Sequence, residues 1–151
     1  MNFELDNNFV FWLSRLNNLM QEEFNKDLLE YEVTWPQWLI LNSLHHKKLD
    51  TPSELAKYLG IDRSAITRLA DRLEKKSLLT RTRNKLDRRN VTLQLSDRGR
   101  VLISGIDSRA QEHQQRYLDA LHSTESRALK AFIQKMLRVN GVEALSSWKH
   151  I

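Results

Sequence analysis

The 151-residue sequence contains no cysteine, which excludes disulfide bonds, thiolate metal sites and redox sensing through a thiol. No apolar run approaches the roughly 20 residues that span a bilayer. The first residues, MNFELDNN, carry acidic rather than basic side chains, unlike a secretory signal. We therefore expect a cytoplasmic protein.

Signatures of enzymes are also missing. The sequence has no Gly-rich phosphate loop, no G-x-S-x-G and no H-E-x-x-H. His45 and His46 are adjacent, so on a helix they diverge by about 100° and cannot share a metal in the usual i, i+4 way. We expect no catalytic activity, no cofactor and no metal.

The composition is that of an ordinary folded protein, with 40% hydrophobic and 28% charged residues in one domain's length of chain. The net charge of +5 is unevenly distributed. Residues 51–100 hold 13 Lys and Arg against 6 Asp and Glu, whereas the rest of the chain holds 11 against 13. Such a basic segment is expected where a protein faces phosphates, although charge alone fits a solvated surface better.

Residues 51–75 predict two short helices joined by a tight turn. Thr51 can cap the first helix, with Glu54 completing a capping box, and Gly60 can end it in a left-handed conformation. The second helix, capped by Asp62, has an apolar arc opposite a cationic, hydrogen-bonding arc. Its apolar residues are Ile66, Leu69, Ala70 and Leu73. This helix-turn-helix presents a second helix suited to a DNA major groove.

A β-hairpin is predicted directly after these helices. Residues 78–83 are rich in Thr and Leu, and Val91, Leu93 and Leu95 alternate with polar residues as in a half-buried strand. The residues between them, 84–90, form a polar tip dense in positive charge. A hairpin that follows a recognition helix defines a winged helix, whose exposed arginines can reach the minor groove.

These segments resemble the MarR family of bacterial winged-helix transcription regulators. The resemblance covers about 35–99 and rests on Trp35-Pro36-Gln37-Trp38, SELAKYLGIDRSAITRLADRLEKKSLLTR and LDRRNVTLQLSDRG. Ser77 and Ser96 depart from the family, which usually has Gly and Thr at these positions.

The resemblance implies a mainly α fold with a small β-hairpin, in which a winged helix-turn-helix is flanked by long dimerisation helices. The whole chain, 1–151, would be a single MarR-like domain. Its DNA-binding part would be about 35–99, and 1–34 and 100–151 would be the dimerisation helices.

Three apolar stripes outside the winged helix predict long helices whose apolar faces must be buried against other protein surface. The first stripe is Phe9, Leu13, Leu16, Met20 and Phe24; the second is Leu102, Ile106, Ala110, His113, Tyr117 and Leu121; the third is Leu129, Phe132, Ile133, Met136 and Leu137. We expect a homodimer built from these helices, which would place two recognition helices about one DNA turn apart on a pseudo-palindromic operator. A monomer with locally packed stripes is the alternative.

Six residues of the second helix are expected to meet DNA: Ser64, Ala65, Thr67, Arg68, Arg72 and Lys75. Arg68 could bind a guanine in bidentate fashion, and the methyl groups of Ala65 or Thr67 could touch a thymine methyl. Arg72 and Lys75 suit phosphates, which position a protein without specifying sequence. A surface ion pair with Asp71 is the alternative role for Arg68.

In the predicted hairpin tip, the resemblance assigns roles to four further residues. Asp87 would brace the hairpin, Arg89 would enter the minor groove, and Arg88 and Lys85 would support it on phosphates. The sequence leaves open which of Arg88 and Arg89 inserts.

Many proteins that this sequence resembles release DNA when a small phenolic or aromatic carboxylate binds. Trp12, Arg15, Trp38, Asn42 and His113 could line such a cleft with aromatic walls, a cation and polar anchors. The simpler role for both tryptophans and for His113 is in a core or an interface.

Two functions therefore remain. The first is a ligand-responsive, sequence-specific regulator of transcription, most often a repressor. The second is an architectural or protein-interaction winged-helix dimer with weak, non-specific DNA binding.

Overall fold

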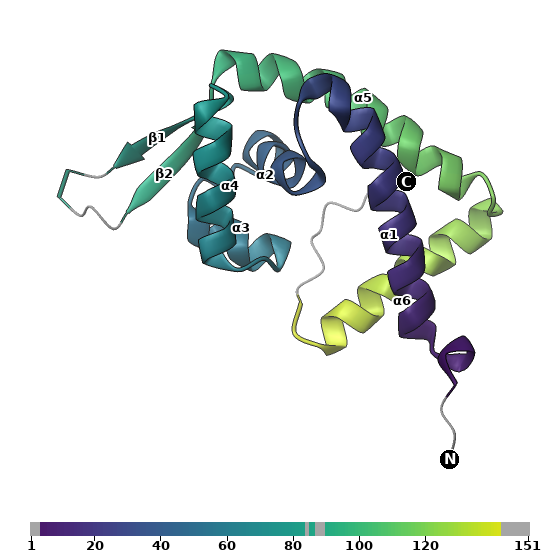
Figure 1. The fold of residues 1–151 in the computed structure, drawn as a ribbon. Coiled ribbons are helices and arrows are strands. Elements are labelled where there is room, and N and C mark those ends of the chain that lie inside the picture. Colours follow the sequence, from purple (N-terminus) through teal and green to yellow (C-terminus); the bar gives the residue numbers. More distant parts are fainter. Residues whose placement is uncertain (1–3, 84, 87–89, 143–151) are drawn as a thin grey trace. The chain divides into compact units, whose positions relative to one another are not determined.

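The computed structural model describes residues 4–83, 85–86 and 90–142 as helices with one two-stranded hairpin (Figure 1). The chain divides into two compact units, Met1–Ala110 and Gln111–Ile151, and the boundary falls within one helix. The helices are η1 (Leu5–Asn7), α1 (Phe9–Leu28), η2 (Leu29–Tyr31), α2 (Trp35–His46), α3 (Pro52–Leu59), α4 (Arg63–Lys75), α5 (Asp97–Leu118) and α6 (Ser123–Val139). The strands are β1 (Leu79–Arg83) and β2 (Val91–Leu95). The mainly α winged-helix prediction is confirmed.

Local hydrogen bonds fix the ends of α3 as the sequence predicts. The backbone N–H of Glu54 donates to Thr51 Oγ1 at 3.2 Å, and the N–H of Thr51 donates to the Glu54 carboxylate at 3.2 Å. Gly60 follows the helix with a φ of 64°, in the left-handed region. Both ends of the first helix of the helix-turn-helix are therefore encoded locally.

Asp62 occupies the N-cap position of α4, as predicted. Its carboxylate accepts a hydrogen bond from the Ser64 hydroxyl, and the backbone N–H groups of Ser64 and Ala65 also lower its pKa. The apolar pattern of the helix could not reveal that the Ser64 side chain shares these oxygen atoms with the helix backbone.

The antiparallel hairpin pairs Leu79 with Leu95 and Arg83 with Val91 at its two ends. Leu93 and Leu95 are buried, which confirms the alternation predicted for β2. The outer edge of β2 is held by one further bond, from the Leu93 N–H to the Asp50 carbonyl at 2.6 Å.

Ser96 caps α5 and also ties it to the base of the hairpin. Ser96 Oγ accepts from the Gly99 N–H at 3.0 Å and donates to the Ser77 carbonyl at 2.7 Å. A side chain at Gly99 would collide with the carbonyl of Leu78, so only glycine fits this approach. The wing and the start of α5 are thereby fixed to each other.

The first unit is built on one apolar core to which every helix from α1 to α5, and both strands, contribute. Its fully buried side chains include Phe24, Leu28, Ile40, Leu41, Leu55, Ile66, Leu73, Leu79, Leu93, Ile103 and Ile106. Three of the four residues of the predicted apolar arc of α4 are buried, and the fourth, Leu69, packs against them half-buried. This core fixes which face of α4 points to solvent.

The stripes of the terminal helices are only partly covered. In α1, Phe24 is buried, but Phe9, Leu13 and Leu16 are 62%, 43% and 46% exposed. The first of these helices, α1, is flanked by the two short 3-10 turns η1 and η2. Leu121 lies beyond the end of α5, because a stripe of apolar residues does not define where a helix stops. In α6, Phe132 is 62% and Met136 43% exposed.

Candidate nucleic-acid interface

The face of α4 opposite its buried arc carries the six residues predicted to meet DNA. Ser64, Thr67, Arg68, Arg72 and Lys75 are exposed, and Ala65 is half-buried. They lie on one 13-residue helix that stands beside the hairpin (Figure 1). The structure therefore brings together three cations and two methyl-bearing side chains on one accessible helical surface.

The hydroxyl groups on this face are already donating within the protein. Ser64 Oγ donates to the Asp62 carboxylate, and Thr67 Oγ1 donates to the Arg63 carbonyl at 3.1 Å. A donating hydroxyl still has free lone pairs, so these side chains can accept hydrogen bonds from a base edge but not donate them. Thr67 accordingly offers an acceptor and a methyl group, and Arg68 supplies donors.

The Ser64 hydrogen bond also lowers the pKa of Asp62, and the positive charge of Arg68 adds to this effect. A carboxyl group with a lowered pKa in the folded state stabilises that state once the pH is above its ordinary pKa. This contribution is lost as the pH falls through the lowered pKa. Asp62 therefore remains ionised near neutral pH at the start of the recognition helix, where negative charge is favourable.

Arg81, on β1, holds α4 from the wing side and was not predicted from the sequence. Its guanidinium pairs with Asp71, lies 3.6 Å from the Glu74 carboxylate and donates to the Thr67 carbonyl at 3.2 Å. The Arg81 side chain is only 15% exposed. Asp71 is thus engaged by Arg81, and not by Arg68 as the alternative for that arginine required.

One sequence signal could have found Arg81. It lies two residues after the buried Leu79, so strand alternation places it on the inward face of the hairpin. A charged residue at an inward strand position needs a partner, and Asp71 and Glu74 are the acidic residues of α4. Asp71 and Glu74 are about half exposed, so neither ion pair is strong by itself, but together with the hydrogen bond to the Thr67 carbonyl they fix the position of α4 against the wing.

The wing tip is described in part. Lys85 and Leu86 are exposed, consistent with a solvent-facing tip. Asp87, Arg88 and Arg89 lie outside the described residues, so their predicted roles in the minor groove remain predictions.

Of the five residues predicted to bind an effector, some make contacts that favour a structural role instead. Trp12 is 52% exposed and its Nε1 donates to the Asp6 carbonyl at 3.0 Å, and Arg15 is also exposed. Trp38 packs edge-on against Phe24, with ring centroids 5.0 Å apart.

The two polar anchors predicted for an effector are each constrained. Asn42 Nδ2 donates to Asp107 Oδ1 at 3.1 Å, and His46 contacts the other oxygen of that carboxylate at 2.7 Å. His113 belongs to the second unit, where it is buried and packs against Tyr117. Asn42 would have to exchange its bond to Asp107 to bind a ligand.

A basic helical face opposite a buried arc, followed by a hairpin fixed to that helix, defines a winged helix-turn-helix protein. Within residues 4–83, 85–86 and 90–142, no helix is both long and apolar enough to cross a membrane.

Comparisons with known proteins give the family. The model of the MarR family matches residues 33–91. The HTH-type transcriptional repressor MdtR of Bacillus subtilis is 34% identical over 119 residues, which are 79% of this chain and 76% of MdtR. The chain therefore belongs to the MarR family of transcriptional regulators.

Solved structures agree on the fold. A mutant MarR from E. coli in complex with operator DNA is 28% identical, with a TM-score of 0.77 over 83% of this chain and 91% of that chain. The organohalide-sensing regulator RdhR, in its 2,4-dichlorophenol-bound form, has a TM-score of 0.86 over 99% of this chain and 93% of that chain. RdhR is only 15% identical, so it shows a shared fold and nothing more.

Proposed function

We propose that the protein is a homodimeric repressor that binds a pseudo-palindromic operator, with α4 in the major groove and the wing in the adjacent minor groove. The observation that carries this proposal is the solvent face of α4, where Arg68, Arg72 and Lys75 stand on a helix that Arg81 holds to the wing. The operator complex of the E. coli MarR mutant and the repressor MdtR support it. A repressor of this kind acts on chromosomal DNA, so we place it in the bacterial cytoplasm at the nucleoid.

Each residue of the α4 face has a distinct proposed role. Arg68, which is exposed, binds a guanine in bidentate fashion, while the methyl groups of Ala65 and Thr67 meet thymine methyls. Arg72 and Lys75 bind phosphates and set the register of the helix on the duplex. Ser64 accepts from a base or backbone donor, since its own proton is used by Asp62.

The dimer is proposed from the apolar side chains that the single chain leaves exposed. The first half of α1 exposes Phe9, Leu13 and Leu16, and α6 exposes Phe132 and Met136. Apolar surface of this extent on one helix face is typical of an interface rather than of a monomer surface. A two-fold dimer would set the two copies of α4 roughly 34 Å apart, one turn of DNA.

The wing contributes through Arg89, with Arg88 and Lys85 on phosphates and Asp87 bracing the hairpin. Arg89→Ala should weaken operator binding tenfold or more while the melting temperature holds. An unchanged operator affinity would remove the wing from the mechanism, and Arg88→Ala measured in parallel identifies which arginine inserts.

A small aromatic or phenolic ligand is proposed to release the operator, and Trp12, Arg15, Trp38 and Asn42 of the first unit are the residues proposed to line its cleft. This ligand class is the one that the resemblance to the MarR family implies. A ligand need only favour a dimer whose helix spacing does not match the groove. Isothermal titration with salicylate-like compounds tests this, and no heat with any of them would count against the cleft.

Selection of bound sites from a random DNA duplex tests the proposed function. A repressor of this kind enriches a palindrome and prefers it to random duplex by about a thousandfold or more. Enrichment of no motif, with affinity set by salt alone, would instead support the architectural winged-helix dimer.

A further inference from the structure

A lysine at the C-terminal end of α4 ties the recognition helix to the segment that joins η2 to α2. Lys76 is the C-cap residue of α4 and is half-buried. Its ammonium group donates to the backbone carbonyl of Glu32 and, at 3.3 Å, to Oε1 of Gln37. Hydrogen bonds from a charged donor are stronger than those between neutral groups. Lys76 therefore holds the end of α4 by two bonds that are independent of Arg81.

Gln37 is a firm point of attachment for this lysine. The Gln37 side chain is buried, and its Oε1 also accepts the Thr34 N–H at 3.2 Å, a bond that closes the N-terminal turn of α2. An amide oxygen has two lone pairs, so it can serve both donors. One buried oxygen atom thus joins the start of α2 to the end of α4.

The same end of α2 is held by α1. Asn25 Oδ1, on α1, accepts the Trp35 N–H at 2.8 Å. Phe24, the residue before Asn25, packs edge-on against Trp35 and Trp38, with ring centroids 5.8 Å and 5.0 Å apart. All these residues belong to the first unit. The start of α2 is therefore the place where α1, α2 and the end of α4 are joined.

Two backbone turns with an uncommon conformation meet at the Lys76 contact. Glu32, whose carbonyl accepts the hydrogen bond, has a φ of 55°, and Ser77, which follows Lys76, has a φ of 59°. Left-handed conformations are uncommon for residues other than glycine and cost free energy. Such conformations persist where the surrounding contacts determine them, and the two Lys76 bonds are contacts of this kind.

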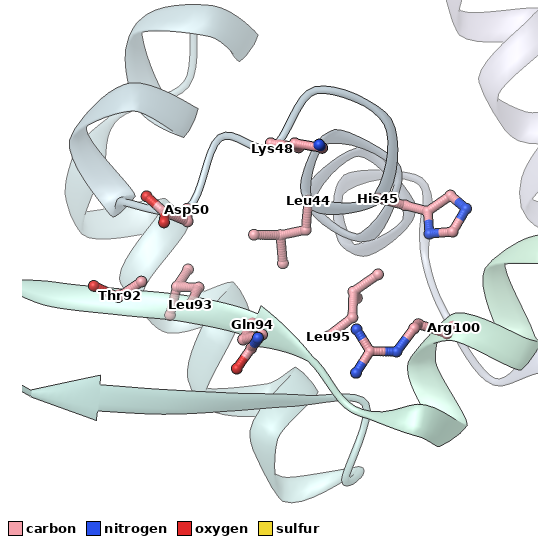
Figure 2. Close-up of a pocket in the computed structure, with 9 residues that line it drawn as sticks. All are labelled: Leu44, His45, Lys48, Asp50, Thr92, Leu93, Gln94, Leu95 and Arg100. Atoms are coloured by element: carbon pink, nitrogen blue, oxygen red, sulfur yellow. The ribbon is translucent and has the colours of Figure 1, made fainter.

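The other end of α2 packs against the wing. Leu44, in the last turn of α2, packs on the core that includes Leu93 and Leu95 of β2, and these three leucines line a cavity at the edge of that strand (Figure 2). α2 therefore contacts the winged helix at both of its ends. The end that holds Lys76 is also the end that α1 holds, so a change there alters α4 relative to α1.

We propose that Lys76 is a positioning residue that fixes the angle between α4 and α1, and through it the half-site spacing that the protein accepts. This role rests on the proposed function, in which α1 contributes to a two-fold dimer and α4 reads each half-site. Arg81 fixes α4 relative to the wing, within one half-site. Lys76 fixes α4 relative to a dimerisation helix, so it acts on the distance and the rotation between the two half-sites.

The test measures binding to the selected operator and to duplexes in which one base pair is added or removed at its centre, which turns one half-site by about 34° relative to the other. The wild type should bind the altered duplexes about tenfold more weakly, because one half-site is out of register. Lys76→Met removes the donor but keeps a chain of similar length, and should reduce this penalty to about threefold. Lys75→Met, at the exposed neighbouring lysine, should keep the penalty and lower the salt slope by about one.

A spacing penalty in Lys76→Met equal to that of the wild type would overturn the role of Lys76 and leave the proposed function intact. A salt slope lowered as in Lys75→Met would make Lys76 a phosphate contact instead. Circular dichroism checks the fold of Lys76→Met, and Lys76→Gln, a shorter neutral donor, is a second variant whose penalty should also fall. If the wild type itself binds every spacing equally, the proposed two-fold dimer is wrong and the role of Lys76 falls with it.

Discussion

The winged-helix part of the chain and the apolar faces of α1 and α6 differ in how their hydrophobic residues are used. Around α4, Ile66, Ala70 and Leu73 are all buried within the chain. In the first half of α1 the corresponding apolar residues are exposed, although their spacing along the helix is as regular. The same sequence signal therefore has two outcomes: a core that one chain completes, and a face that one chain leaves open.

The difference shows which properties belong to the single chain. The position of α4, its basic face and its tie to the wing through Arg81 follow from contacts within one unit. The covering of Leu13, Leu16 and Phe132 requires further apolar surface, which the proposed dimer supplies. Substitutions in the core around α4 should consequently change the stability of the single chain. Substitutions on the exposed apolar faces of α1 and α6 should change dimerisation.

The largest effect is expected from Ile66→Ala, in the closed core. Ile66 is completely buried, so the variant should lose about 2–5 kcal/mol of unfolding free energy in urea. Thr67→Ala, one residue along and exposed, should change it by less than about 0.5 kcal/mol. Equal costs at the two positions would mean that the buried arc of α4 is wrongly assigned.

The double substitution Leu13→Glu/Leu16→Glu tests whether the exposed apolar face of α1 forms the dimer interface. Two buried negative charges would abolish the proposed interface, so sedimentation should show a monomer and operator affinity should fall at least a hundredfold. Asn18→Glu introduces one negative charge on α1 away from the apolar stripe and should stay dimeric. A Leu13→Glu/Leu16→Glu protein that remains a dimer would place the interface elsewhere.

Arg68→Ala should reduce operator affinity about tenfold to a hundredfold and relax the base preference at one position of each half-site, since a bidentate contact to guanine contributes roughly 1–3 kcal/mol. Arg72→Ala should weaken all duplexes alike and lower the salt slope by about one. Competition assays with single-base operator variants distinguish a base contact from a phosphate contact. If Arg68→Ala weakens binding to all these variants equally, Arg68 contacts a phosphate and not a base.

The smallest effect is expected for Arg81→Gln, which releases α4 from the wing without removing a DNA contact. Operator affinity should fall about three- to tenfold because the recognition helix is less well positioned. The salt slope should stay as in the wild type, unlike that of Arg72→Ala. A reduced slope would show that Arg81 binds a phosphate directly.

Local signals predicted the winged helix well because its elements are defined by near neighbours. The Thr51–Glu54 capping box, Gly60 and the alternation in β2 all depend on residues within four positions of one another. The exposed face of α4 was predicted for the same reason, from helical periodicity.

The features that the sequence did not predict depend on contacts between residues far apart in the chain, or on side chains that share one partner. Arg81 was missed because its partners lie 7, 10 and 14 residues earlier, on another element. The hydrogen bond from the Ser64 hydroxyl to Asp62 was not predicted, because the apolar pattern of α4 carries no information about it. The cavity at β2 combines residues 44–50 with residues 92–100, which no pattern in the sequence places together.

The most direct test of the central claim is the stoichiometry and affinity of the protein on its selected operator, compared with a duplex in which one half-site is scrambled. We predict two chains per operator duplex and an affinity at least a hundredfold lower for the scrambled duplex. A single chain that binds one half-site as tightly as the intact operator would contradict the account.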